Sequence, residues 1–237
     1  MSPVASANPT TAMTHFEASI DGLRQRLLTM ASYAGQSIRN AIRAVVERDD
    51  EISRKVEEDD TLLDDAEKAI DELAIQLLLR APLARDLRLI MVATKISHDL
   101  ERVGDEATAI ARRALELNRE PQLKAPIDLH KMAAMVTEML ADALDAFVHA
   151  DSSRARALIP RDKQVDALNK QLQRDLTALI VESPDNTTRC LNLMTISKRL
   201  ERVGDHAKNI AEEVVYLNEA TDIRHTQRAA HETGCAS

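Results

Sequence analysis

Glu101-Arg-Val-Gly-Asp105 and Glu201-Arg-Val-Gly-Asp205 are the same five residues, repeated 100 positions apart. The identity extends beyond this ERVGD motif to three further positions in each copy: Ala107, Ile110 and Ala111, then Ala207, Ile210 and Ala211. Self-similarity at a fixed period indicates a structural unit that is used twice. The chain of 237 residues is therefore predicted to contain two repeats of about 100 residues each.

Apolar residues around both motifs have the spacing of a helix that packs through one face. They recur at alternating steps of four and three residues, at Ile96, Leu100, Val103, Ala107, Ile110, Ala114 and Leu117, and at Ile196, Leu200, Val203, Ala207, Ile210, Val214 and Leu217. This spacing is a heptad seam, which is typical of long helices in bundles. Both ERVGD motifs are thus expected in the middle of equivalent helices.

Helix-breaking residues divide each repeat into three helical stretches. We expect helices over residues 14–48, 51–80 and 84–118, and then over 127–150, 152–182 and 186–219. Short connections make successive helices antiparallel. The predicted fold is all-α, a tandem repeat of two antiparallel three-helix bundles. The predicted domains are a disordered N-terminus at 1–13, a first bundle at 14–120, a second bundle at 127–219 and a flexible tail at 220–237.

The composition is typical of helices packed through aliphatic side chains, with 5 Gly, 7 Pro and 2% aromatic residues. A net charge of -8 argues against nucleic-acid binding, because it would repel a phosphate backbone. The sequence carries neither a secretory signal nor an apolar run approaching the ~20 residues that span a bilayer. We therefore expect a cytoplasmic protein that reaches a membrane only through partners.

Spaced carboxylates are the candidate metal ligands. Residues four apart share a helix face, so the two acids of each ERVGD motif repel one another unless a cation or an arginine lies between them. Pairs of aspartates with the same spacing occur on the second predicted helix of each repeat. The candidate ligands are Glu101, Asp105, Glu201, Asp205, Asp60, Asp64, Asp162 and Asp166. The alternative interpretation is a solvated acidic face, which charged helices commonly have.

The candidate metals are Fe, Mn, Mg and Zn, and no single ion is specified. Oxygen donors suit hard or borderline cations such as Fe, Mn, Mg or Ca better than a structural tetrahedral Zn site. His206 follows the second motif where the first has Glu106, so a symmetric histidine ligand is excluded, and we interpret His206 as a surface residue. No histidine has a glutamate three residues before it, which argues against a ferritin-like di-iron site.

Gly104 and Gly204 lie within the predicted helices, where glycine costs about 1 kcal/mol relative to alanine. Two explanations stay open: space for a metal ion with its waters, or close packing of a neighbouring helix.

The sequence resembles the PhoU family through its duplicated ERVGD motif, each copy continuing x-A-x-x-I-A. The segment Arg80-Ala-Pro-Leu-Ala-Arg-Asp-Leu-Arg88 is similar to the turn into the family's third helix, whereas Pro184-Asp-Asn-Thr-Thr-Arg189 in the second repeat departs from it. The resemblance covers residues 14–219. It implies two three-helix bundles with metal clusters on the acidic faces of Glu101 and Asp105 and of Glu201 and Asp205, the second-helix aspartates being less secure.

The resemblance also implies a negative regulator of phosphate-starvation signalling and phosphate uptake. Such a protein would link the ATPase subunit of a phosphate ABC transporter to a sensor histidine kinase. A homodimer is compatible with the pattern, although nothing in the sequence sets the oligomeric state. The usual nucleotide-binding and hydrolase motifs are missing, so we expect no enzyme. The alternatives are a metal-buffering bundle and a metal-dependent phosphohydrolase.

Overall fold

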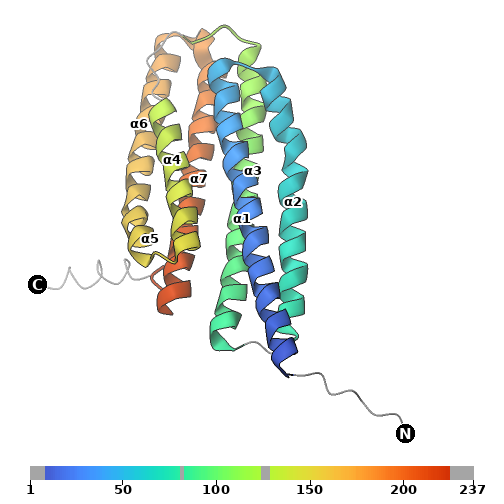
Figure 1. Cartoon of the computed structure of the whole chain (residues 1–237). Coiled ribbons are helices and arrows are strands. Elements are labelled where there is room, and N and C mark those ends of the chain that lie inside the picture. The colour runs from blue at the N-terminus through green and yellow to red at the C-terminus, as the bar shows by residue number, and fades with distance from the viewer. Residues whose placement is uncertain (1–8, 81–82, 124–128, 225–237) are drawn as a thin grey trace, which may run out of the picture.

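The computed structural model describes residues 9–80, 83–123 and 129–224 and consists of two helical bundles (Figure 1). The first contains α1 (Pro9–Glu47), α2 (Asp50–Leu78) and α3 (Ala84–Asn118). The second contains α4 (Leu129–His149), α5 (Ser152–Leu158), η1 (Ile159–Arg161), α6 (Asp162–Glu182), η2 (Pro184–Asn186) and α7 (Thr187–Glu219). The predicted all-α fold of two antiparallel three-helix bundles is confirmed.

Helices α3 and α7 form the centre of the molecule. They run antiparallel beside one another, with α1 and α2 on one side and α4 to α6 on the other (Figure 1). Every residue of the predicted heptad seams is buried except Leu217, which is partly buried against the core. Because the buried residues of both repeats form one continuous core, the two bundles are packed together through α3 and α7.

The predicted helix over 152–182 is wrong in one respect, because the structure divides it into α5, η1 and α6. Pro160 lies in the short 3-10 segment. It has no N–H to donate and its ring clashes with the preceding turn, so a continuous α-helix cannot pass through it.

The ends of the chain differ in part from the prediction. Helix α1 begins at Pro9, within the range 1–13 that we expected to be disordered. Proline is well tolerated in the first turn of a helix, where its missing N–H has no partner to lose. Helix α7 ends at Glu219 and is followed by the capping residue Ala220, whose φ of 58° is left-handed. Residues 1–8 and 225–237 lie outside the described residues.

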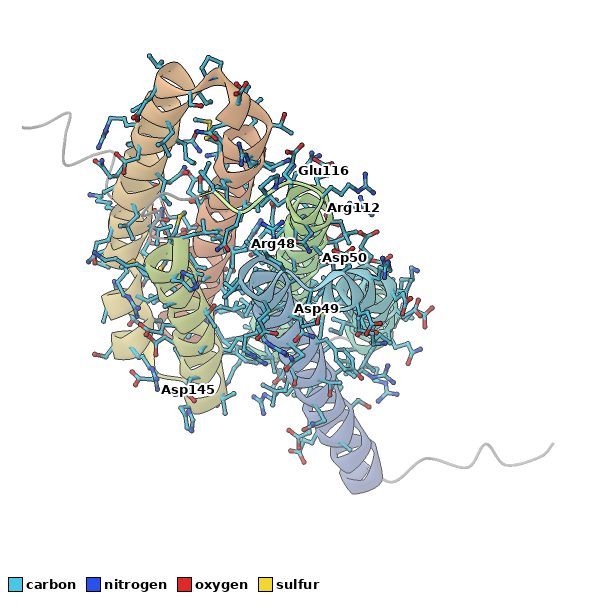
Figure 2. All side chains as sticks on the ribbon, turned by 90° about the horizontal axis from the view of Figure 1, so that it is seen from above. Arg48, Asp49, Asp50, Arg112, Glu116 and Asp145 are labelled. Carbon is cyan, nitrogen blue, oxygen red and sulfur yellow. The ribbon has the colours of Figure 1, made fainter. Side chains whose placement is uncertain are left out.

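One end of the first bundle is closed by hydrogen bonds between its helices. Arg48, with a left-handed φ of 55°, donates to the carbonyls of Leu117 at 2.8 Å and Glu120 at 2.5 Å. Asp49 caps α2 through its carboxylate. Figure 2, viewed onto this end, shows Arg48, Asp49 and Asp50 at the α1–α2 turn beside the end of α3. These contacts fix the C-terminal end of α3 against the α1–α2 turn.

Candidate functional site

The first acidic face lies where α2 crosses the middle of α3. An added Cβ on Gly104 would lie closer than 3.0 Å to Leu63 Cδ1 and 3.5 Å from Asp60 Oδ1. The missing side chain therefore lets α2 approach α3 and brings the Asp60 carboxylate against the ERVGD motif. Burial, followed by the charges of Asp105 and Asp64, raises the pKa of Asp60, which the Thr108 hydroxyl partly offsets.

Two more donors lie at the same face, and the sequence analysis missed both. One ligand atom from each of Glu67, His98 and Glu101 lies within 4.8 Å of the others, and His98 Nδ1 is 3.3 Å from Glu67 Oε1. Burial and Asp105 raise the pKa of Glu101, whereas Arg102 lowers it. The sequence signal was available, since Glu67 continues the stripe of Asp60 and Asp64 and His98 lies one turn before Glu101.

The second acidic face is formed by the corresponding residues of α6 and α7. Burial, followed by the charges of Asp162 and Glu201, raises the pKa of Asp205 to about 6, with Asp166 adding to the rise and Lys208 opposing it. All four predicted carboxylates of this repeat therefore lie close enough to interact. Such a group of acids in a partly buried place is unfavourable without a cation.

Lysines supply positive charge at the second face. Lys208 Nζ is 2.7 Å from Asp162 Oδ2, and Lys198 forms an ion pair with Glu201. The other oxygen of Asp162, Oδ1, is buried without a hydrogen-bond partner, and this side chain is only 10% exposed. The two faces thus have carboxylates at corresponding positions but differ in the positively charged side chains beside them.

Close helix packing accounts for one of the two motif glycines, Gly104. A Cβ on Gly204 would meet Val165 at 3.4 Å and Val136 at 3.6 Å, and the one on Gly104 would meet Leu63. Of the two explanations that the sequence left open, the structure favours packing at Gly104, whereas at Gly204 a Cβ would make only ordinary contacts.

Charged residues join α3 to α7 between the two faces. Glu106, buried on α3, accepts from Arg199 at 3.1 Å and from Arg202 at 3.3 Å. His206 Nδ1 is 2.8 Å from Asp99 Oδ1, and the His206 side chain is only 19% exposed. His206 is therefore not a free surface residue but a partly buried one, which pairs with Asp99 where α3 and α7 pack together.

Both motifs open onto one polar hollow between the bundles. It is lined by Arg102, Asp105, Glu106, Arg199, Arg202, Asp205 and His206. The side chains at the first face could hold a cation through oxygen donors and His98. At the second face the unpartnered Asp162 oxygen is a suitable donor, but Lys208 stands beside it. Metal binding by the eight predicted carboxylates stays a prediction.

Among the described residues, none of the helices combines the length and apolar character that a membrane span requires.

Comparison with known proteins places the chain among helical accessory proteins. The PhoU domain model matches residues 27–114 and 129–214, one match in each bundle. The phosphate-specific transport system accessory protein PhoU homolog of Pseudomonas aeruginosa is 37% identical over 89% of this chain and 88% of its own. The phosphate-specific transport system accessory protein PhoU of Escherichia coli is 32% identical over the same shares. These relatives are named as accessory proteins, in agreement with the expectation of no enzyme.

Solved structures of the same kind superpose over most of the chain. The crystal structure of PhoU from Pseudomonas aeruginosa gives a TM-score of 0.85 at 36% identity and covers 87% of this chain and 100% of its own. The phosphate transport system regulatory protein PhoU from Streptococcus pneumoniae gives 0.82 at 28% identity, covering 88% and 99%. One domain model matches both repeats, and the fold is shared along the length of these relatives. The chain therefore belongs to the PhoU family.

Proposed function

We propose that the protein is a cytoplasmic accessory protein of a phosphate-specific transport system that restrains phosphate-starvation signalling and phosphate uptake. The observation that carries this proposal is the pair of PhoU domain matches, one in each bundle, within a chain that covers 88% of relatives bearing that name. We propose domain ranges of 14–120 and 127–219 for the two bundles. The proposed partners are the ATPase subunit of a phosphate ABC transporter and a sensor histidine kinase, through which alone it reaches the membrane.

Protein contacts would carry the regulation. Large apolar side chains are exposed near the α2–α3 turn, including Leu79, which is 82% exposed, and Leu83, which is 78% exposed. Exposed apolar residues grouped on a surface are typical of a contact with another protein. For the kinase to change state, the protein must bind one of its states more tightly than the other, because equal affinity shifts no equilibrium. Equal recovery of kinase variants locked in either state would count against this step.

The acidic faces would add cation binding to this role. Asp60, Asp64, Glu101 and Asp105 on the first face, with their counterparts Asp162, Asp166, Glu201 and Asp205, are the proposed ligands. A bound divalent cation would neutralise carboxylates that are partly buried and repel one another. Burial, and after it neighbouring acids, raise the pKa values of Asp60, Glu101 and Asp205. These carboxylates, which lie on both helices of each pair, would fix the distance between α2 and α3 and the distance between α6 and α7.

A deletion experiment tests the regulatory role. We expect a phosphate-starvation reporter to become active in phosphate-rich medium when the gene is deleted, and to be silenced again by the wild-type gene. A silent reporter after deletion, in a strain with no second copy, would contradict the proposal. Rescue by a variant with Asp105→Ala and Asp205→Ala would show that signalling does not need the acidic faces, whereas failed rescue by this variant, when folded, supports their role.

A further inference from the structure

We propose that the two acidic faces are unequal cation sites, because Lys208 acts as the built-in cation of the second face while the first is open to a divalent ion. This inference rests on the cation binding proposed above. It assigns to Lys208 the role of deciding which of the two faces takes up metal.

The internal repeat identifies the position that differs. Aligning the two ERVGD motifs places Thr108 of α3 opposite Lys208 of α7. Thr108 is a buried, uncharged residue close enough to Asp60 to lower the pKa of that carboxyl, whereas Lys208 donates to Asp162 through its ammonium group. Asp60 and Asp162 are themselves corresponding residues of the second helices. The same place in the two repeats is therefore occupied by a neutral group in one and by a positive charge in the other.

Lys208 is held firmly among acids. Its Nζ lies 2.7 Å from Asp162 Oδ2. Burial opposes the charged form of Lys208, but the hydrogen bond to Asp162 and the charges of Asp162, Glu212 and Asp205 outweigh it and raise its pKa. The lysine side chain is 31% exposed and that of Asp162 only 10%. Salt and water weaken such a partly buried pair less than a surface pair. A divalent ion arriving here would have to displace the ammonium group or lie beside a like charge.

The donors needed for a second site are nevertheless present. Asp162 Oδ1 is buried and has no hydrogen-bond partner, although Lys208 occupies the other oxygen of the same carboxylate. A buried acceptor without a partner is costly. Removing the ammonium group would thus leave a carboxylate with two free oxygens among three further acids, with no new ligand required.

The first face has positive groups too, but they lie at its exposed edge. Arg102 is 2.9 Å from Asp105 and its side chain is 49% exposed. Arg112 is 3.6 Å from Glu57 and 63% exposed. Exposed pairs of this kind contribute little and are easily exchanged for another cation. A divalent ion can therefore replace them at a lower cost than it can replace Lys208.

The first face also offers donors that the second has lost. Glu67 and His98 of the first repeat correspond to Asn169 and Lys198 of the second. Asn169 Oδ1 accepts from Ser197 at 2.9 Å, and Lys198 pairs with Glu201. A second ammonium group therefore occupies the place of the first face's only histidine, and both substitutions weaken the second face as a metal site.

Exchange of the two residues tests the inference. Metal-free wild type, Lys208→Thr and Thr108→Lys would be titrated with Mn²⁺ alone, with bound ion measured by calorimetry and free ion by electron paramagnetic resonance. We expect wild type to bind at the first face only, and Asp60→Asn to abolish that binding. Lys208→Thr should add a second class of sites, with affinity for the second face raised about tenfold or more, since like charges held close cost several kcal/mol. Thr108→Lys should lose the first class.

Lys163→Thr is the matched control, because it removes the same charge from an exposed position next to Asp162 in the sequence. It should leave binding unchanged. If Lys208→Thr adds no Mn²⁺ while wild type still binds at the first face, the inference is wrong and the proposed cation binding stands. If no folded variant binds Mn²⁺ at all, the proposed cation binding fails and the inference with it. Should Thr108→Lys unfold, as circular dichroism would show, Lys208→Thr and its control decide the question.

Discussion

Replacing the two motif glycines with alanine should change stability in opposite directions. In a helix interior, alanine is favoured over glycine by about 1 kcal/mol. At Gly204 the new Cβ meets Val165 no closer than 3.4 Å, an ordinary contact, so Gly204→Ala should stabilise the protein by about 0.5–1 kcal/mol. At Gly104 the Cβ would come within 3.0 Å of Leu63 Cδ1, which is 1% exposed and cannot move into solvent.

The cost of that overlap is of the size found for overpacked cores, about 1–3 kcal/mol. Gly104→Ala should therefore be destabilising by about 1 kcal/mol net, which places it about 2 kcal/mol below Gly204→Ala. Urea unfolding followed by circular dichroism measures both, with Gly22→Ala as the control, because a Cβ there meets nothing within 4 Å and reports propensity alone. If Gly104→Ala were as stable as Gly204→Ala, the packing of α2 on α3 would not be as tight as we infer.

Three further changes test the charges and the helix ends. Asp205→Asn should stabilise the metal-free protein at pH 7. Folding raises the pKa of the Asp205 carboxyl from 3.8 to about 6, so the wild-type protein becomes less stable as pH rises between these values. The loss is about 1 kcal/mol after discounting for solvent screening. The advantage of Asp205→Asn in urea unfolding should vanish below pH 4, and an advantage that is the same at every pH would contradict this. Glu106→Gln should cost about 2 kcal/mol in unfolding free energy, because it leaves Arg199 and Arg202 without a buried counter-charge; an unchanged urea midpoint would show that the cluster contributes nothing. Ala220→Gly should raise the melting temperature, since φ is 58° at this helix end and glycine adopts it without strain; a lowered value would argue against that conformation.

The sequence was sufficient for the fold because periodicity reports burial directly. A seam with steps of four and three residues must face an apolar neighbour along its whole length, and α3 and α7 bury it almost completely. Because the sequence is duplicated, the helices predicted for one repeat could also be predicted for the other. The break in the helix over 152–182 was also visible as Pro160, and it was missed because the aligned second helix of the first repeat has no proline at that place.

The candidate site was harder to predict because its members come from different helices. Asp60 and Asp105 could be paired through the repeat, but the approach of α2 to α3 at Gly104 depends on side-chain volume that periodicity does not measure. His98 carries no motif of its own in the sequence, because its partner Glu67 comes from another helix and no glutamate lies three residues before it. The partial burial of His206 depends on how one bundle packs against the other. The apolar pattern of a single helix gives no signal for that packing.

The residue after each motif explains why identical pentapeptides make different contacts. Helices α3 and α7 are antiparallel, so the arginine of each motif lies near the residue that follows the other motif. Arg202 therefore meets the carboxylate of Glu106 and crosses between the bundles to bind it. Arg102 would meet His206, which carries no negative charge and is paired with Asp99. Arg102 therefore donates to Asp105 of its own motif instead. One replacement of an acid by histidine thus couples the second motif to the first bundle and leaves the arginine of the first motif on its own acidic face. The repeats are consequently not interchangeable, and a change of charge at the second motif should be felt across the interface between the bundles more strongly than the same change at the first.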